Sequence, residues 1–555
     1  MPSPGFQALI LCGPGVSFNT FTSNPRGFPK ALVPIANRPM VWYPIEWCAR
    51  MGITDITLIT PPESKSAISS ALSLDPHFTP LPNPSVLAPA ALTQTTGTAE
   101  IFRLPEVQSL IQKDFLVLPC DLVCQLNGTS LLQEWMISQA GFGSEDDDDA
   151  GPAGELIGRR GGLAVLYPTR GADAVKGEQT DFTALIPLPP PVVPRPPASL
   201  RSEMAQLALL IPTDSLKESN EEKGHFAMRL ALLRPAGRAR LLTTHRDAGV
   251  YFLPRWAARY FMLNAFDSLA EDALGWWAKA SWQTGLARKL NMDKAVRRPK
   301  RRSASNPEDD MEEEEVEPEP NVADYSTTQY AQPGGGRRTF ATRVRGQGAV
   351  MVEEEMKVPK LLAYVHPDNP EGPVIRRVDN VALLLAISLR LAKLPSVAEA
   401  GSKAAAGPYA HAAKIAASAT LGKQTRVETE SSLVAENVTI GERTNIKESV
   451  IGVGCEIGSG VRMQGCLLMD GVVVGDNVTL AGCVVGRRAK VEGGARTDRA
   501  KTSLKECEVQ EGFLVPWGTE EKNQKYMVFE GYSEDEGSVQ GGEGRSIDQM
   551  LEDED

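Results

Sequence analysis

The chain has 555 residues, a formal net charge of −12 and eight cysteines, and 42% of its residues are hydrophobic. This length is enough for two or more hydrophobic cores. Eight cysteines without a signal segment, and the lack of an apolar run of membrane-spanning length, lead us to expect a reduced, cytosolic protein with no membrane partner.

The N-terminal apolar run predicts a buried first strand. Residues 8–11 are apolar and are followed by Cys-Gly-Pro-Gly at 12–15, which is typical of a strand that leads into a glycine turn. Glycines let the backbone approach a phosphate closely, but phosphate transfer also needs fixed cations that neutralise the developing charge. Gly13, Gly15 and Lys30 are therefore candidate phosphate-binding residues, and Lys30 is the one obvious cation.

The segment from Phe28 to Met40 is the most specific part of this region. It reads Phe-Pro-Lys-Ala-Leu-Val-Pro-Ile-Ala-Asn-Arg-Pro-Met. It resembles the sugar-phosphate nucleotidyltransferases, whose signature runs from G-x-G-[ST]-R to P-K-P-L, and this resemblance implies a Rossmann-like α/β domain with a mostly parallel sheet. Ser17 stands where that family has its phosphate-binding arginine, and Ala31 replaces the second proline. Arg26 has the wrong spacing to substitute for the arginine.

Two further apolar runs, at 56–59 and 115–118, are separated by helix-length segments and predict a βαβ arrangement. Ligands of such sheets bind at the carboxyl ends of the strands, where Asp121 falls. The resemblance implies that Asp121 is the family's metal-binding aspartate, which would hold Mg²⁺; a helix N-cap or loop carboxylate is an equally good interpretation. Gly97 and Thr98 resemble the family's nucleotide-contacting G-T-A segment, and a simple turn explains them equally well.

Several catalytic parts of that family are missing together. Asp379 lies about where the family places its second metal-binding aspartate, but the aromatic residue before it and the Gly-Thr-Pro after it are absent. The Glu-Lys-Pro segment upstream of residues 248–252 is also absent. Because these losses remove both charge neutralisation and metal geometry, we expect a vestigial pocket with no catalysis and no cofactor. Asp121 and Asp379 are then vestigial metal candidates.

From residue 429, β-branched and glycine-rich repeats follow with a fixed period of 17 residues. Three apolar positions per turn predict a three-sided parallel β-helix, and its hexapeptide character resembles left-handed β-helices. About four turns fit between residues 430 and 500, with Thr497 interrupting the third column and residues 513–517 capping the end. The predicted inward columns are Val434, Ile451, Leu468 and Val485; Ile440, Ile457, Val474 and Val491; and Ile446, Met463 and Leu480.

One more column, Ser449, Cys466 and Cys483, is interpreted as small stacked fillers rather than as metal ligands. Some left-handed β-helices are acyltransferases, which commonly use a histidine base. No histidine follows His411, so an acyltransferase is not expected.

Composition sets the predicted domain boundaries. Acidic residues gather in three stretches, and runs of like charge with Pro, Gly and Ser cannot bury enough apolar surface to fold. The basic run at 297–302 adjoins one acidic stretch that would neutralise it, so we expect no direct nucleic-acid binding. The predicted organisation is a nucleotidyltransferase-like domain at 1–287 and 347–395 with disordered insertions near 142–160 and 288–346, a linker at 396–428, the β-helix at 429–520 and an acidic disordered tail at 521–555.

The order of the two domains resembles the gamma-subunit family of eukaryotic translation initiation factor 2B. The segments that carry this resemblance are residues 41–46, 97–100, 117–122 and 449–452. The related epsilon subunit adds a C-terminal helical-repeat domain with the exchange activity, whereas only a short acidic tail follows the β-helix here. The resemblance implies a non-catalytic regulatory or assembly subunit that acts with the epsilon and other subunits in GDP/GTP exchange on translation initiation factor 2.

Two other functions remain open from the sequence. The chain could be an active mannose-1-phosphate guanylyltransferase, with Lys30 binding phosphate and Asp121 holding Mg²⁺. Alternatively, the degraded pocket could bind GTP or a sugar nucleotide without turnover and act as a sensor.

Overall fold

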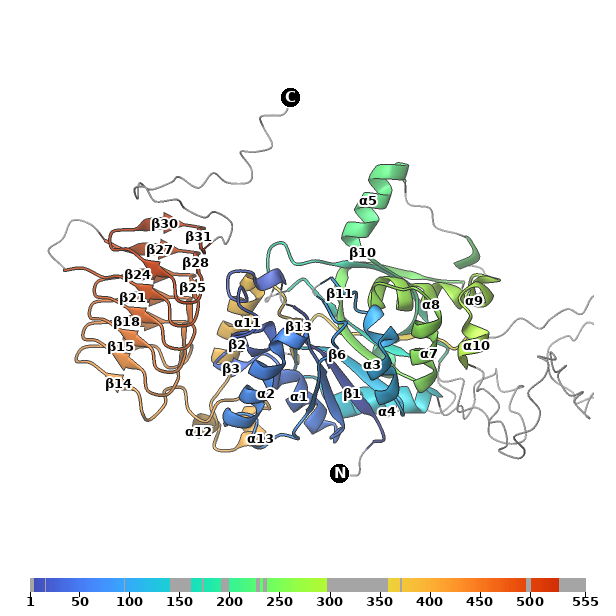
Figure 1. Ribbon diagram of the computed structural model, residues 1–555, viewed down its shortest axis with the longest axis horizontal. Helices are drawn as coiled ribbons and strands as arrows, with labels where there is room; N and C mark the ends of the chain where they lie inside the picture. The colour runs from blue at the N-terminus through green and yellow to red at the C-terminus, as the bar shows by residue number, and fades with distance from the viewer. Residues whose placement is uncertain are drawn as a thin grey trace, which may run out of the picture.

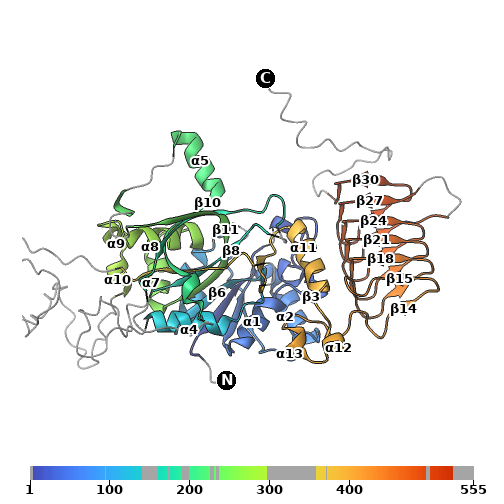
Figure 2. The same cartoon turned by 180° about the vertical axis from the view of Figure 1, so that it is seen from behind.

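The computed structural model has an α/β domain beside a β-helix (Figures 1 and 2). The predictions for Gly15, for Thr497, for residues 142–160 and 297–357, and for the tail from 529 onward lie outside the described residues. The structure describes residues 4–14, 16–93, 95–139, 161–171, 174–190, 199–225, 230–232, 237–296, 358–369, 372–495 and 501–528.

A nine-stranded sheet forms the centre of the first domain, in the order β5-β4-β1-β6-β11-β8-β12-β10-β9. All of these strands except β10 and β11 run in one direction, as expected for a mostly parallel sheet. The three strands predicted from the sequence are β1, β4 and β6. The bounds are β1 Gln7–Leu11, β4 Ile56–Ile59, β5 Ser85–Leu87, β6 Phe115–Pro119, β8 Leu163–Pro168, β9 Asp181–Pro187, β10 Met204–Pro212, β11 Arg240–Leu253 and β12 Leu362–Val365.

Alternate residues of the central strands face two helical layers, because successive strand side chains point to opposite faces. Ala8 and Ile10 of β1 join the core beneath the first layer, and Leu9 joins the core beneath the second. The first layer contains α1 Trp42–Arg50, α2 Lys65–Leu74, α4 Gly128–Gln139 and α11 Val381–Ala392; the second contains α3 Pro105–Leu110, α7 Arg255–Leu263, α8 Gly275–Ala280, α9 Leu286–Lys289 and α10 Met292–Val296.

The predicted insertion boundary at residue 288 is wrong. Helices α9 and α10 continue the first domain to Val296, and the buried side chains of Met292 and Ala295 belong to its second core. The basic residues of this stretch concealed its few apolar side chains in the composition. A separate helix, α5 Thr213–Lys223, buries none of its side chains and projects from the α/β domain (Figure 1).

The second domain is a parallel β-helix whose three sheets each have six strands. Successive strands of the central turns pair at the predicted period, and all three predicted columns are confirmed by the register. The strands are β14 Thr420–Leu421, β17 Thr439–Ile440, β20 Glu456–Ile457, β23 Val473–Val474, β26 Lys490–Val491 and β29 Leu514–Val515; β15 Arg426–Val427, β18 Asn445–Lys447, β21 Arg462–Gln464, β24 Thr479–Ala481, β27 Ser503–Lys505 and β30 Glu520–Lys522; and β16 Leu433–Val434, β19 Val450–Ile451, β22 Leu467–Leu468, β25 Val484–Val485, β28 Glu508–Val509 and β31 Lys525–Tyr526.

The β-helix is longer than predicted at both ends. Its first strands, β14 and β15, lie inside the stretch that was predicted to be a linker, after two short helices, α12 Val397–Ala400 and α13 Lys403–Ala406. At the other end, Leu480 pairs with Leu504, so the third column continues after extra residues in the turn. The segment 513–517 contains β29, which is another strand of the coil rather than its cap, and β31 lies inside the predicted tail.

The two domains share one hydrophobic core. In β16, β19, β22 and β25, one residue of each two-residue strand points into the coil, and the other packs toward α11. Among the described residues, one helical stretch, 381–400, is long and apolar enough to cross a membrane by length and composition. Here its first part, α11, packs beside β19 and β22 of the coil (Figure 1), and its buried side chains Leu384, Ile387 and Leu391 belong to the core that the two domains share.

A hairpin from the Phe28–Met40 segment fastens this interface. Strands β2 Pro34–Ile35 and β3 Arg38–Pro39 are joined by Ala36 and Asn37, both with positive φ. The Asn37 side-chain amide donates to the Ile451 carbonyl at 2.9 Å, and the buried Arg38 guanidinium donates to the carbonyls of Tyr409 and Ala410 at 2.9 and 2.7 Å. The most specific sequence segment is therefore the junction between the domains.

Shortening one side chain of the inward columns tests the packing of the β-helix. Leu468→Ala should lower the free energy of unfolding by about 2–5 kcal/mol, because Leu468 is fully buried and alanine leaves a cavity. Denaturant midpoints measure this change. Val453→Ala is the control, since the Val453 side chain is exposed, and it should shift stability by less than about 0.5 kcal/mol. Equal effects of the two substitutions would contradict the assignment of the columns.

Candidate functional site

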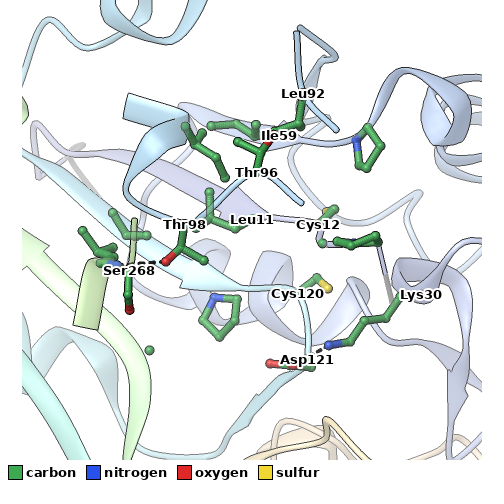
Figure 3. A pocket seen from close by; sticks show the side chains of 18 of the residues that line it. Leu11, Cys12, Lys30, Ile59, Leu92, Thr96, Thr98, Cys120, Asp121 and Ser268 are labelled. Carbon is green, nitrogen blue, oxygen red and sulfur yellow. Dashed lines mark hydrogen bonds and ion pairs between the residues drawn. The ribbon is translucent and has the colours of Figure 1, made fainter. Parts of the chain in front are cut away.

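A cavity of about 330 Å³ lies at the carboxyl ends of β1, β4 and β6 (Figure 3). Parallel strands end at the same edge of a sheet, which is where ligands of such folds bind. The wall is mostly apolar, with hydroxyl groups on one side and charged groups on the other. Its residues include Leu11, Cys12, Gly13, Lys30, Ile59, Leu92, Thr93, Thr96, Thr98, Ile101, Val117, Cys120, Asp121, Tyr251, Ser268 and Arg377.

The structure brings together four of the predicted pocket residues: Gly13, Lys30, Thr98 and Asp121 all line the cavity. Gly97 allows two backbone segments to pack closely. A Cβ atom at Gly97 would lie 2.3 Å from the carbonyl oxygen of Asp267, so only glycine fits this close approach.

Asp121 is a buried carboxylate between two cations. Its Oδ2 lies 2.7 Å from Nζ of Lys30, and its Oδ1 lies 3.2 Å from Nε of Arg377. Burial alone would raise the pKa of Asp121, but the charges of Arg377 and Lys30 outweigh burial and hold that pKa well below its usual range. The same attraction keeps the pKa of Lys30 above its usual value despite burial. All three groups are therefore charged at neutral pH.

Arg377 is the functional residue that sequence reasoning missed. Strand β13 Ile375–Arg377 pairs antiparallel with β7 Leu122–Cys124, and this register places Arg377 opposite Leu122, next to Asp121. The Val378 amide also donates to the Asp121 carbonyl at 2.8 Å. Asp121 and Arg377 are far apart in the sequence, so their contact is visible only once this strand pair is known.

The second predicted metal ligand, Asp379, is engaged by a different cation. It forms a bidentate ion pair with the buried guanidinium of Arg246. Mg²⁺ prefers oxygen ligands in octahedral geometry, whereas both candidate carboxylates here are neutralised by side-chain cations. Within the described part of the chain, no group of three His, Cys, Asp or Glu side chains could hold a metal ion. These residues therefore do not fit a Mg²⁺ site.

The missing arginine of the glycine loop is replaced by apolar packing. Ser17 is exposed, whereas the next side chain, Phe18, is fully buried. The ammonium group of Lys30 lies 5.7 Å from the centroid of the Phe18 ring, a distance at which a cation is attracted to the face of an aromatic ring. The loop thus presents a ring to Lys30 rather than a second cation to a phosphate.

The segment between the glycine turn and Lys30 is held by the β-helix. The Thr20 hydroxyl donates to the Glu508 carboxylate at 3.0 Å, and the Gln510 amide donates to the Ser23 hydroxyl at 2.9 Å. The Arg487 guanidinium lies 4.5 Å from the centroid of the Phe28 ring. This segment, residues 18–28, is named the tethered loop below.

The fold and cavity define a class. A Rossmann-like sheet with a cavity at its carboxyl edge, joined to a parallel β-helix, is a nucleotidyltransferase-fold protein with a β-helix domain. The nucleotidyl transferase family model matches residues 25–144, and a model described as the LbH domain of EIF2B subunit epsilon matches residues 410–515. These matches confirm the predicted fold class.

More particularly, the chain is similar to the gamma subunit of translation initiation factor eIF2B from Schizosaccharomyces pombe. The two are 23% identical over 297 residues, which is 53% of this chain and 56% of the relative. The matched region thus spans little more than half of that protein. The predicted resemblance to eIF2B gamma subunits is confirmed.

Removing the charge of Asp121 tests the ion cluster. Asp121→Asn should lower the free energy of unfolding by about 3–5 kcal/mol, because Lys30 and Arg377, which are only partly exposed, lose the buried carboxylate between them. Denaturant midpoints report this loss. The control Asp55→Asn removes an exposed carboxylate that lies 3.7 Å from Lys113, and it should cost less than about 1 kcal/mol. An Asp121 variant as stable as the control would contradict the cluster.

Asp247 gives a prediction for pH dependence. Burial, and then the charge of Asp181, raise the pKa of Asp247 to about 6, above about 3.9 in an unfolded chain. The folded protein therefore binds the proton of the Asp247 carboxyl more tightly than the unfolded chain does. The stabilisation that this proton gives the folded protein is complete below about pH 4 and is lost as the pH rises through about 6. Asp247→Asn should flatten this part of the stability curve.

Melting temperatures of both proteins between about pH 4 and 7 measure the slope. The Asp214→Asn variant is the control and should keep the parent slope, because Asp214 is exposed and pairs with Lys217 at the surface. An unchanged slope in Asp247→Asn would contradict the assignment.

Proposed function

We propose that this chain is a non-catalytic subunit of the guanine-nucleotide exchange factor for translation initiation factor 2. In this role it acts with the epsilon subunit and the other subunits of the factor in the cytosol, and contributes surfaces for assembly rather than reaction chemistry. The similarity to an eIF2B gamma subunit supports the translation-factor role, and the match of its β-helix to an epsilon-subunit domain is consistent with related subunits in one complex.

The ion cluster around Asp121 is the main support for the proposal that this subunit is non-catalytic. A nucleotidyl transfer site needs cations that are free to neutralise the transferred phosphate. Lys30 and Arg377, the two cations of the cavity wall, both contact the same buried carboxylate. A triphosphate would have to compete with Asp121 for each of them, and Asp121 would repel it. This arrangement favours a stable scaffold over turnover.

A second candidate is an active mannose-1-phosphate guanylyltransferase. The retained cavity, with Lys30 and Asp121 in its wall, favours it. The poor fit of the carboxylates to Mg²⁺ argues against it. The cavity could also bind GTP or a sugar nucleotide without catalysing a reaction. Asp121→Ala is the control that shows whether such binding uses the cavity.

Affinity purification of the full chain from its own cells, followed by mass spectrometry, tests the proposal. We expect the epsilon subunit and translation initiation factor 2 to be recovered. In parallel, pyrophosphate release from GTP and mannose 1-phosphate with Mg²⁺ should stay at background, with a known guanylyltransferase as positive control. A monomer without these partners would refute the subunit role, and pyrophosphate release at a rate comparable to the control enzyme would establish the second candidate.

A further inference from the structure

Two of the eight cysteines lie in the cavity wall. All eight are buried and none is paired in a disulfide. Cys12 and Cys120 line the cavity, whereas Cys48 and Cys124 lie in the core of the first domain, and the other four lie in the core of the β-helix. Of the eight cysteines, Cys12 and Cys120 are therefore the ones that border the cavity.

The sheet register places these two cysteines side by side. Leu11 of β1 is the parallel partner of Pro119 of β6, and the Cys120 amide donates to the Leu11 carbonyl at 3.1 Å. Cys12 and Cys120 are the next residues on the two strands, and both point to the same face of the sheet. Adjacent strands lie about 4.8 Å apart, which is inside the Cα spacing of about 4.4–6.8 Å that disulfides require. Figure 3 shows both side chains at the cavity wall.

Charged groups lie next to this pair of thiols. Cys120 directly precedes Asp121, whose carboxylate contacts Lys30 and Arg377. The thiolate is the reactive form of cysteine, and either thiol of the pair can provide it.

We propose that Cys12 and Cys120 form a redox-sensitive dithiol that hydroperoxides oxidise to a disulfide. One thiol of the pair loses its proton, its sulfur attacks one oxygen of hydrogen peroxide and the O–O bond breaks; the leaving hydroxide takes up the proton as water, which leaves a sulfenic acid. The sulfur of the other cysteine then attacks the sulfur of the sulfenic acid, and its proton leaves with the hydroxyl group as a second water. Two thiols lose two electrons and two protons, and one peroxide is reduced to two waters.

The disulfide would change the cavity at its phosphate end. Cys12 precedes Gly13 of the glycine turn, and Cys120 precedes Asp121 of the ion cluster. A covalent bond there ties the two strand ends together and removes both thiols from the wall. A thiol reductant such as dithiothreitol reverses it, so the pair fits the transient, sensing type of disulfide found in reducing compartments.

The chain contains its own comparison pair. Cys466 and Cys483 precede the paired residues Leu467 and Val484 on adjacent turns of the β-helix, so they stack in the same parallel register as Cys12 and Cys120. They differ in access, because they lie in the closed core of the coil and not in the cavity wall. Selective oxidation of the cavity pair would therefore reflect the cavity rather than strand spacing alone.

The test is peroxide treatment of the full, folded chain, followed by alkylation and mass spectrometry without reduction. We expect a cross-linked peptide pair that contains Cys12 and Cys120 and has lost two hydrogen atoms, formed at least about tenfold faster than any link between Cys466 and Cys483. Dithiothreitol should restore both thiols. Cys120→Ser should abolish the link, whereas Cys466→Ser should leave it unchanged.

Two outcomes would overturn the proposal: Cys12 and Cys120 that remain separately alkylated after oxidation, or a Cys466–Cys483 link that forms equally fast. The measurement on the unaltered chain decides the question even if a serine variant fails to fold. It needs no partner subunit or nucleotide, so its result is independent of the proposed function.

Discussion

A buried carboxylate must be compensated, and the compensation of Asp121 determines what the carboxyl edge of this sheet can do. Two side-chain cations, Lys30 and Arg377, provide it. They come from the segment after the glycine loop and from β13, so the ion cluster joins the first strands of the domain to its last ones. Because both cations contact Asp121, the buried carboxylate is compensated without a ligand.

The β-helix was predictable because its signal is local and periodic. Each inward position recurs at a fixed interval, so Ile451 predicts Leu468 and then Val485 without any knowledge of the rest of the fold. The prediction failed where the period fails. The step from Leu480 to Leu504 contains extra residues, so a fixed spacing does not lead from one to the other.

The cavity was only partly predictable, for the opposite reason. The glycine turn and the strand end led to Gly13 and Asp121, and both line the cavity because parallel strands bring their carboxyl ends to one edge. Thr98 also lines it, and it was proposed from the family resemblance alone. Arg377 could not be found in this way, since it depends on an antiparallel pair between distant segments. The specific run from Phe28 to Met40 predicts the nucleotidyltransferase fold, and much of it, including Asn37 and Arg38, also serves the contact between domains.

The tethered loop gives the two domains a thermodynamic connection. One end of this loop leads to Lys30 in the cavity wall, and its middle is bonded to Glu508 and Gln510 on the late turns of the β-helix. Any molecule that binds those turns and displaces the loop changes the free energy of the cavity. By reciprocity, occupancy of the cavity changes the affinity of that molecule by the same factor. The contacts of the tethered loop therefore link the late turns of the β-helix to the segment that carries Lys30.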